Sequence, residues 1–276
     1  MKGTLPPIAA ALLLVSLFGG RLLPLAMAIG LFVAFGLLKD WQDWPTWPHE
    51  LWSAPNGTQW LLWGVLAGGL VALLEHLRLL PSRLAAALGV LVAGGSVWLM
   101  LVKTQTANQW STFDIVRHIG GGGFGVALLV LASRTVIARG PANLGPAFVF
   151  ATMLSADAAV IALSSGLLGQ LCGAVAAALG AAAGTSLWRR PFALTAADGT
   201  WIGVTHGLFL LAGVHLSALP WSAAGCALLA PCALLLLRPK AAAKPVLWTM
   251  AALALTLISL GGAFWFAFQS SLQAGY

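Results

Sequence analysis

The amino-acid sequence predicts an all-α integral membrane protein, a polytopic helical bundle of about ten transmembrane helices with both termini outside. Of its 276 residues, 60% are hydrophobic and only 8% are charged. A soluble domain carries charge on about a quarter of its residues, because its surface must be hydrated. The apolar runs have the length of helices and lack the short alternating pattern of membrane barrel strands. We therefore expect residues 1–276 to form a single multi-pass transmembrane domain, with the lipid bilayer as its partner.

The first two apolar runs, residues 5–19 and 22–38, are shorter than those that follow. Each is short for a hydrocarbon core of about 30 Å, because a helix rises only about 1.5 Å per residue. They form either two short spans or a hairpin that crosses the bilayer in part. Because the two runs come as a pair, both alternatives place the rest of the chain on the same side.

Eight further runs follow the polar, tryptophan-rich segment 39–57. Turn residues such as Pro81 and Pro191 separate neighbouring runs, since proline cannot continue a helix from the preceding residue. The predicted spans are 58–76, 83–102, 112–138, 141–164, 167–187, 200–216, 221–237 and 246–268.

Local patterns predict how some of these helices begin and pack. Ser111 and Asp114 have the spacing of a capping box, which predicts the start of the fifth helix. Gly64 and Gly68 are four residues apart, as in helices that approach closely in membranes. The run 167–187 has small residues at five positions of one face, which predicts close helix–helix packing near the centre of the bundle.

Basic residues are distributed unequally between the two sides of a ten-span topology, and this predicts the orientation. Loops rich in Lys and Arg stay in the cytoplasm, and the alanine-rich composition is typical of a bacterial inner-membrane protein. The basic residues lie singly beside apolar runs, so the net charge of +7 needs no nucleic acid. The predicted cytoplasmic loops are 20–21, 77–82, 139–140, 188–199 and 238–245.

Asp157 is the most informative single residue, because it lies near the centre of the span 141–164. A carboxylate at that depth costs about 2.5–3.5 kcal/mol on insertion scales. Its partner must come from another helix or from water, or the group must stay protonated. His206, in the span 200–216, is the ionisable residue best placed to be that partner. Asp157 is either a proton- or cation-coupling site or a structural hydrogen-bonding group, and His206 is either its coupling partner or a neutral core histidine.

Two clusters of charged residues lie at the ends of predicted helices. Glu75 and Arg78 are three residues apart near the end of the third span, and Asp114 and Arg117 have the same spacing at the start of the fifth. This spacing places both members on one helical face, so we expect interfacial ion pairs. A functional gate is the alternative for the first pair, and Asp114 is also within reach of His118.

A run of glycines follows His118 directly: Gly120, Gly121, Gly122 and Gly123. Each glycine is about 1 kcal/mol poorer than alanine in a helix, so the run loosens the helix and exposes its backbone. Broken helices of this kind line substrate cavities in transporters. The alternative is close packing through Gly121 and Gly125, which requires only two of the glycines.

The leading functional interpretation is a permease-like transporter of a small solute or ion, with Asp157 as the coupling residue. The second is a non-catalytic membrane scaffold or accessory subunit. The third is an outward-facing enzyme on lipid-linked substrates, in which Asp40, Asp43, His49 or Glu50 would act beneath the tryptophans of the same loop. The chain has no Walker A, HExxH or GxSxG sequence, so we assign no catalytic residue, metal site or cofactor.

Overall fold

The computed structural model describes residue 9 and residues 22–39, 57–185, 193–237 and 244–273. Within these residues every regular element is a helix. The helices are α2 (Leu23–Leu38), α3 (Gly57–His76), α4 (Ser82–Ala107), α5 (Thr112–Ile115), a π-helical turn (Val116–Gly120), α6 (Gly121–Arg139), α7 (Gly145–Ala162), α8 (Gly166–Thr185), α9 (Ala196–Ser217), α10 (Trp221–Leu234) and α11 (Pro245–Gln273).

Seven of the described helical segments are long and apolar enough to cross a membrane. They are α3, α4, the continuous segment Thr112–Arg139, α7, α8, α9 and α11. Two more apolar helices, α2 and α10, are shorter, at 16 and 14 residues. The prediction of a multi-pass helical membrane protein is therefore confirmed. The first predicted span, 5–19, lies outside the described residues.

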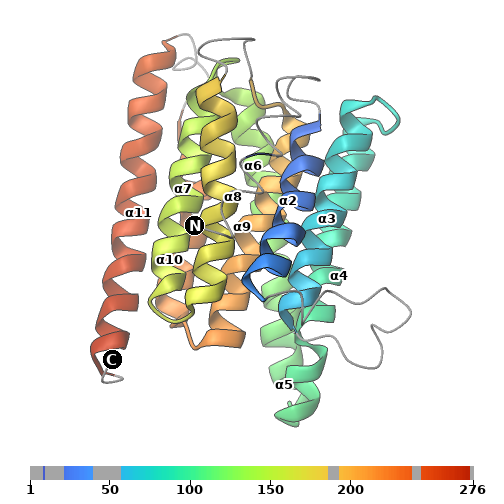
Figure 1. The fold of residues 1–276 in the computed structure, drawn as a ribbon, viewed down its shortest axis with the longest axis vertical. Coiled ribbons are helices and arrows are strands. Elements are labelled where there is room, and N and C mark those ends of the chain that lie inside the picture. The colour runs from blue at the N-terminus through green and yellow to red at the C-terminus, as the bar shows by residue number, and fades with distance from the viewer. Residues whose placement is uncertain (1–8, 10–21, 40–56, 186–192, 238–243, 274–276) are drawn as a thin grey trace.

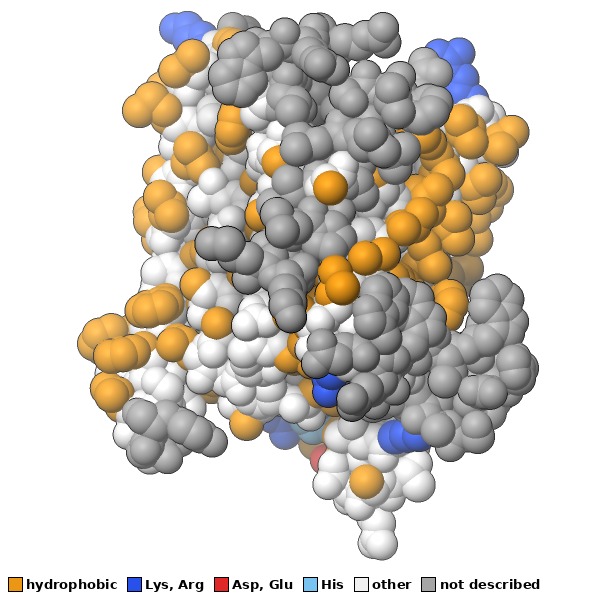
Figure 2. Space-filling model, viewed as in Figure 1, with side chains coloured by type: hydrophobic (Ala, Val, Ile, Leu, Met, Phe, Trp, Pro, Cys, Tyr) orange, Lys and Arg blue, Asp and Glu red, His pale blue; other side chains and the backbone are white. Residues whose placement is uncertain are grey.

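The helices stand side by side along the long axis of the molecule, with α11 at one edge and α3 and α4 at the other (Figure 1). On the face shown in Figure 2, hydrophobic side chains are spread along the sides of the bundle, and the visible Lys and Arg side chains lie near its two ends. Large apolar side chains are among the exposed ones, such as Leu91 at 68% and Ile258 at 73%. This distribution suits a lateral surface covered by lipid tails.

Helix α9 lies at the centre of the bundle. Every residue from Ala197 to Gly213 is buried, and 83% of its apolar stretch is buried against 61% for α8. The small-residue helix predicted at 167–187 is less buried than α9, so α9 occupies the centre itself. That helix, observed as α8, packs mainly along α7, and α9 contacts α3, α4 and α6.

Glycines allow α9 to lie directly against the backbone of α6. A Cβ atom added to Gly199 would lie 2.6 Å from the Cα atom of Arg134, and one added to Gly203 would lie 2.6 Å from that of Val130. Gly207, one turn further, faces the side chain of Val126. The three glycines recur every four residues, the spacing of close helix approach in membranes. The same signal was present in the sequence at 199, 203 and 207.

The two packing predictions based on small residues are confirmed. A Cβ atom added to Gly169 of α8 would lie 2.7 Å from the Cβ atom of Ala162, so this face of α8 packs tightly on α7. In α3, Gly64 faces Leu208 and Gly68 faces Val204, both on α9. These contacts hold α7, α8 and α3 around the centre and position the polar residues described next.

Candidate functional site

Polar residues gather at three levels of the bundle. One end, here called the α3–α4 end, contains the turns between α3 and α4 and between α6 and α7. The opposite end, the α5 end, contains α5 and the turns 163–165 and 218–220 (Figure 1). Helices α7 and α9 both begin at the α3–α4 end and run in the same direction. The third level lies between them, within the membrane-spanning part.

Asp157 and His206 form a buried pair at this middle level. The Oδ2 atom of Asp157 lies 2.5 Å from Nδ1 of His206, and neither side chain has any exposed surface. The structure therefore joins the two residues that the sequence singled out. Within the described residues, Oδ1 of Asp157 and Nε2 of His206 have no hydrogen-bond partner. A proton shared at the Oδ2–Nδ1 contact would join the two side chains, while the other two polar atoms of the pair stay without a hydrogen bond to the described residues.

The surroundings of the pair are apolar. Leu154 and Ile161, one turn away from Asp157 on either side, are fully buried. Helix α8 reaches the same level, where Cys172 donates a hydrogen bond of 3.4 Å to the carbonyl oxygen of Leu154. In such surroundings an ionisable pair that loses one member leaves the other without compensation. Asp157 and His206 therefore couple the position of α7 to that of α9.

Arg134 is the hub of a polar network at the α3–α4 end. Its guanidinium donates to both carboxylate oxygens of Glu75, at 2.7 Å and 3.0 Å. It also donates to the hydroxyl groups of Thr200, at 2.6 Å, and Ser82, at 2.8 Å. The expected pair of Glu75 and Arg78 is thus replaced by a partner 59 residues away. Arg78 is instead exposed in the turn after α3, with a left-handed φ of 58°.

A second interaction ties α3 to the start of α9 beside this network. Nε2 of His76 lies 3.0 Å from Oδ1 of Asp198. The other carboxylate oxygen of Asp198 accepts bonds from the backbone N–H and hydroxyl groups of Thr195, at 2.7 Å and 3.0 Å, in a capping box. Helices α3, α4, α6 and α9 are therefore joined by charged groups at this end.

At the α5 end, Asp114 caps its own helix. It accepts hydrogen bonds from the backbone N–H and hydroxyl groups of Ser111, at 3.1 Å and 2.7 Å, so the predicted capping box is confirmed. No ion pair between Asp114 and Arg117 forms within the described part of the chain, and Arg117 is exposed. The spacing of Asp114 and Arg117 on one helical face was not enough to form an ion pair, because the carboxylate of Asp114 already accepts hydrogen bonds from Ser111.

His118 belongs to an aromatic cluster that the sequence did not reveal. Its ring centroid lies 4.8 Å from that of Trp110, 5.1 Å from that of His215 and 5.7 Å from that of Trp221. These residues come from the turn between α4 and α5, the π-helical turn, α9 and α10. The π-helical turn itself supplies His118, and such turns occur frequently at functional sites. Their separation along the chain explains why no local pattern grouped them.

The glycines that follow His118 have two different surroundings: some pack against α4, and some line a groove. Gly122 and Gly123 are buried, and a Cβ atom added to Gly123 would lie 3.4 Å from the Cα atom of Gly94 in α4. Gly120 and Gly121 are exposed. The close packing thus uses Gly122 and Gly123, and not the alternative pair Gly121 and Gly125. Gly121, Gly122 and Gly125 line a groove of about 240 Å³ together with Arg117 and Trp221.

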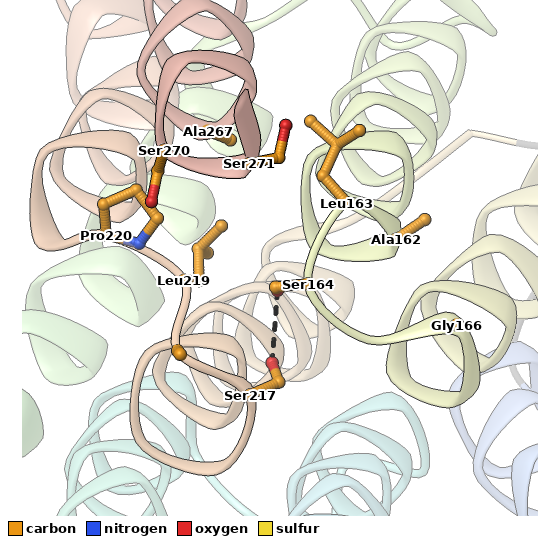
Figure 3. Close-up of a pocket in the computed structure, with 11 residues that line it drawn as sticks. Ala162, Leu163, Ser164, Gly166, Ser217, Leu219, Pro220, Ala267, Ser270 and Ser271 are labelled. Carbon is orange, nitrogen blue, oxygen red and sulfur yellow. Dashed lines mark hydrogen bonds between the residues drawn. The ribbon is translucent and has the colours of Figure 1, made fainter. Parts of the chain in front are cut away.

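A pocket of about 260 Å³ opens at the α5 end between α7, α9 and α11 (Figure 3). Four serines line it: Ser164, Ser217, Ser270 and Ser271. The Oγ atoms of Ser164 and Ser217 lie 3.3 Å apart, and Ser217 also lies 2.8 Å from the carbonyl oxygen of Gly213. Among the described residues, no charged side chain lines this pocket. Ser164, Ser217 and Ser271 each donate to a nearby backbone carbonyl oxygen, so their hydroxyl oxygens are left to accept hydrogen bonds from a small polar molecule. They do so without supplying a counter-charge.

Two walls of the pocket continue the helices that hold the buried pair. Ser164, in the turn after α7, follows Asp157 by seven residues. Ser217, the last residue of α9, follows His206 by eleven residues, about 16 Å along the helix. Neither Asp157 nor His206 lines the serine pocket or the groove beside Gly121. Helix α9 thus contributes a residue at each of the three levels. Thr200 belongs to the Arg134 network, His206 to the buried pair and Ser217 to the serine pocket.

No known family model matches the chain, and no curated protein matches it. Among the described residues, no group of three or more His, Cys, Asp and Glu side chains is arranged to hold a metal ion. Asp40, Asp43, His49 and Glu50, on which the enzyme interpretation depends, lie outside the described residues. The buried pair, the serine pocket and the Arg134 network therefore carry the functional interpretation.

Proposed function

We propose that this chain is a permease-like transporter of a small polar solute, coupled to protons through Asp157 and His206. The observation that carries the proposal is the complete burial of this ionisable pair between two membrane-spanning helices. Ionisable residues are costly inside a bilayer, and those that occur there often belong to proton or ion pathways. A role in proton coupling would explain why the chain keeps this pair in spite of its energetic cost.

The orientation is part of the proposal. With ten spans in a bacterial inner membrane, the α3–α4 end faces the cytoplasm and the α5 end faces outward. Arg78, Arg83, Arg134 and Arg139 all belong to the α3–α4 end, which supports this direction. The serine pocket then opens to the outside, and the Arg134 network closes the cytoplasmic side.

The pair would act through the two helices that it joins. A proton added to or removed from the Oδ2–Nδ1 contact changes the attraction between α7 and α9. Because both helices also form walls of the serine pocket, a shift of one against the other would alter the pocket. The same shift of α9 would strain the bond of Thr200 to Arg134 at the opposite end. Opening one end and closing the other is the alternating access that transporters require.

A specific observation favours the second candidate, a non-catalytic scaffold or accessory subunit. Asp157 is already hydrogen-bonded to His206, and neither residue lines the serine pocket or the groove beside Gly121. In a scaffold the pair would only hold α7 against α9. The two functions differ in one measurable property, which is whether water and protons reach Asp157.

Infrared difference titration of the protein reconstituted in lipid tests this property. If the pair is a coupling site that water and protons reach, the protonated-carboxyl band of Asp157 changes in intensity as the pH of the medium is changed. The band should disappear in Asp157→Asn and remain in Asp114→Asn, which removes an exposed carboxylate that caps a helix. A spectrum without a titrating band, together with an Asp157→Asn protein that is merely less stable, would overturn the transporter proposal and favour the scaffold.

A further inference from the structure

We propose that α4 and α6 form a binding site for the phosphate headgroup of an anionic phospholipid at the α3–α4 end. A groove of about 340 Å³ lies between the start of α4 and the end of α6. Arg83 of α4 and Arg139 of α6 both line it, together with the hydroxyl-bearing residues Ser82 and Thr135. This site is separate from the buried pair and does not depend on the proposed transport function.

The two arginines supply uncompensated positive charge. Both are exposed, and neither has a carboxylate partner within the described residues. Arg134 also lines the groove, but its charge is balanced by Glu75.

The other described carboxylates are also engaged elsewhere. Asp114 caps α5, Asp157 bonds to His206, and Asp198 bonds to His76. Two guanidinium groups from neighbouring helices thus face one groove without a counter-ion in the described part of the chain. A phosphate group suits them, because its oxygens accept the paired N–H donors of arginine.

The surface of α6 below the groove changes from polar to apolar in the direction of the bilayer core. Arg139, Thr135, Leu131 and Leu128 recur at helical spacing on one face, with Leu131 exposed by 43% and Leu128 by 44%. The surface of helix α4 changes in the same way, from the exposed Arg83 at its start to the exposed Leu91 about two turns further along. Cationic groups at the helix ends and apolar side chains deeper in the membrane match the headgroup and acyl chain of a lipid. A free phosphate ion would use only the first of these features.

The test compares ligands on the full chain purified in detergent. Native mass spectrometry and thermal unfolding would be measured with phosphatidylglycerol, with phosphatidylcholine and with inorganic phosphate. We expect bound phosphatidylglycerol and a raised unfolding temperature with that lipid, and neither effect with phosphatidylcholine. Equal stabilisation by inorganic phosphate would overturn the lipid assignment and leave a site for a free anion.

Variants locate the site. Arg83→Gln and Arg139→Gln should each weaken phosphatidylglycerol binding by about tenfold, which corresponds to about 1.4 kcal/mol, since each removes a charge-assisted interaction. Both side chains are exposed, so the variants should fold. Arg117→Gln is the matched control, because it removes an exposed arginine at the α5 end and should leave binding unchanged. Undiminished binding in the Arg83→Gln, Arg139→Gln double variant would refute the proposed site.

Discussion

Oδ2 of Asp157 and Nδ1 of His206 lie 2.5 Å apart at the centre of the bundle, although 49 residues separate them in the chain. The contact joins α7 to the most deeply buried helix, α9. Both side chains are completely buried, so each supplies the hydrogen bond that offsets the cost of burying the other. This relationship has consequences for stability that can be measured whatever the function of the chain.

The first prediction concerns the coupling between the two residues. Asp157→Ala should lower the free energy of unfolding by about 1–3 kcal/mol beyond the loss of packing, because it leaves the imidazole of His206 buried without its partner. The double variant Asp157→Ala, His206→Ala should be less destabilised than the sum of the single variants. Unfolding in mixed micelles measures all three. Strictly additive effects would show that the contact contributes nothing specific.

The second prediction distinguishes the observed partner of Glu75 from the expected one. Arg134→Ala should lower the free energy of unfolding by about 3 kcal/mol, because Glu75 keeps its carboxylate in a largely buried position without a counter-charge. Arg78→Ala removes an exposed arginine one turn from Glu75 and should change stability by no more than about 0.5 kcal/mol. The same denaturant titration compares the two variants. Equal effects would contradict the geometry of the network.

The third prediction tests the contact between the backbones of α6 and α9. Gly203→Ala should destabilise the protein by about 1–3 kcal/mol, because its Cβ atom would meet the backbone of α6 at Val130. Gly95→Ala is the control, since nothing lies within 4 Å of its Cβ position. In that exposed place alanine should stabilise α4 by up to about 1 kcal/mol. Opposite signs are expected in thermal unfolding, and two effects of the same sign would count against this packing.

The fourth prediction concerns the turn that forms one wall of the serine pocket. Ala218 ends α9 with a left-handed φ of 58°, a conformation that costs a residue with a Cβ atom about 1–2 kcal/mol. Ala218→Gly should therefore raise the unfolding temperature. Ala223→Gly, inside α10, should lower it, because glycine is poorer than alanine within a helix. A fall in both variants would show that Ala218 contributes contacts that outweigh its strain.

Much of the architecture could be predicted because it depends on local composition. The apolar runs from 22–38 to 246–268 all coincide with helices, and the capping box at Ser111 and Asp114 starts α5 as expected. The importance of Asp157 was also evident, since a carboxylate in an apolar run requires compensation wherever the helix lies. Its pairing with His206 could be anticipated because few other ionisable groups lie in the spans.

The positions of the other polar residues could not be predicted in the same way. Glu75 has Arg78 within reach on its own helix, yet it bonds to Arg134, which adds a buried bidentate geometry and the hydroxyl groups of Ser82 and Thr200. The cluster of His118, His215 and Trp221 likewise combines three separate segments. Distances between segments depend on which helices are neighbours, and spacing along one helix contains no such information.

By itself, the sequence determined that this chain forms apolar helices that cross a membrane, roughly where each helix begins and ends, and that Asp157 needs a partner. These properties follow from hydropathy, backbone capping and the cost of a charge in lipid, all of which act on short stretches of chain. Only the tertiary structure decided that α9 is the central helix, that Arg134 joins four helices, and that serines from the turn after α7, from α9 and from α11 meet in one pocket. Those outcomes depend on how closely helix backbones can approach one another. Here Gly199 and Gly203 allow the backbone of α9 to lie directly against that of α6.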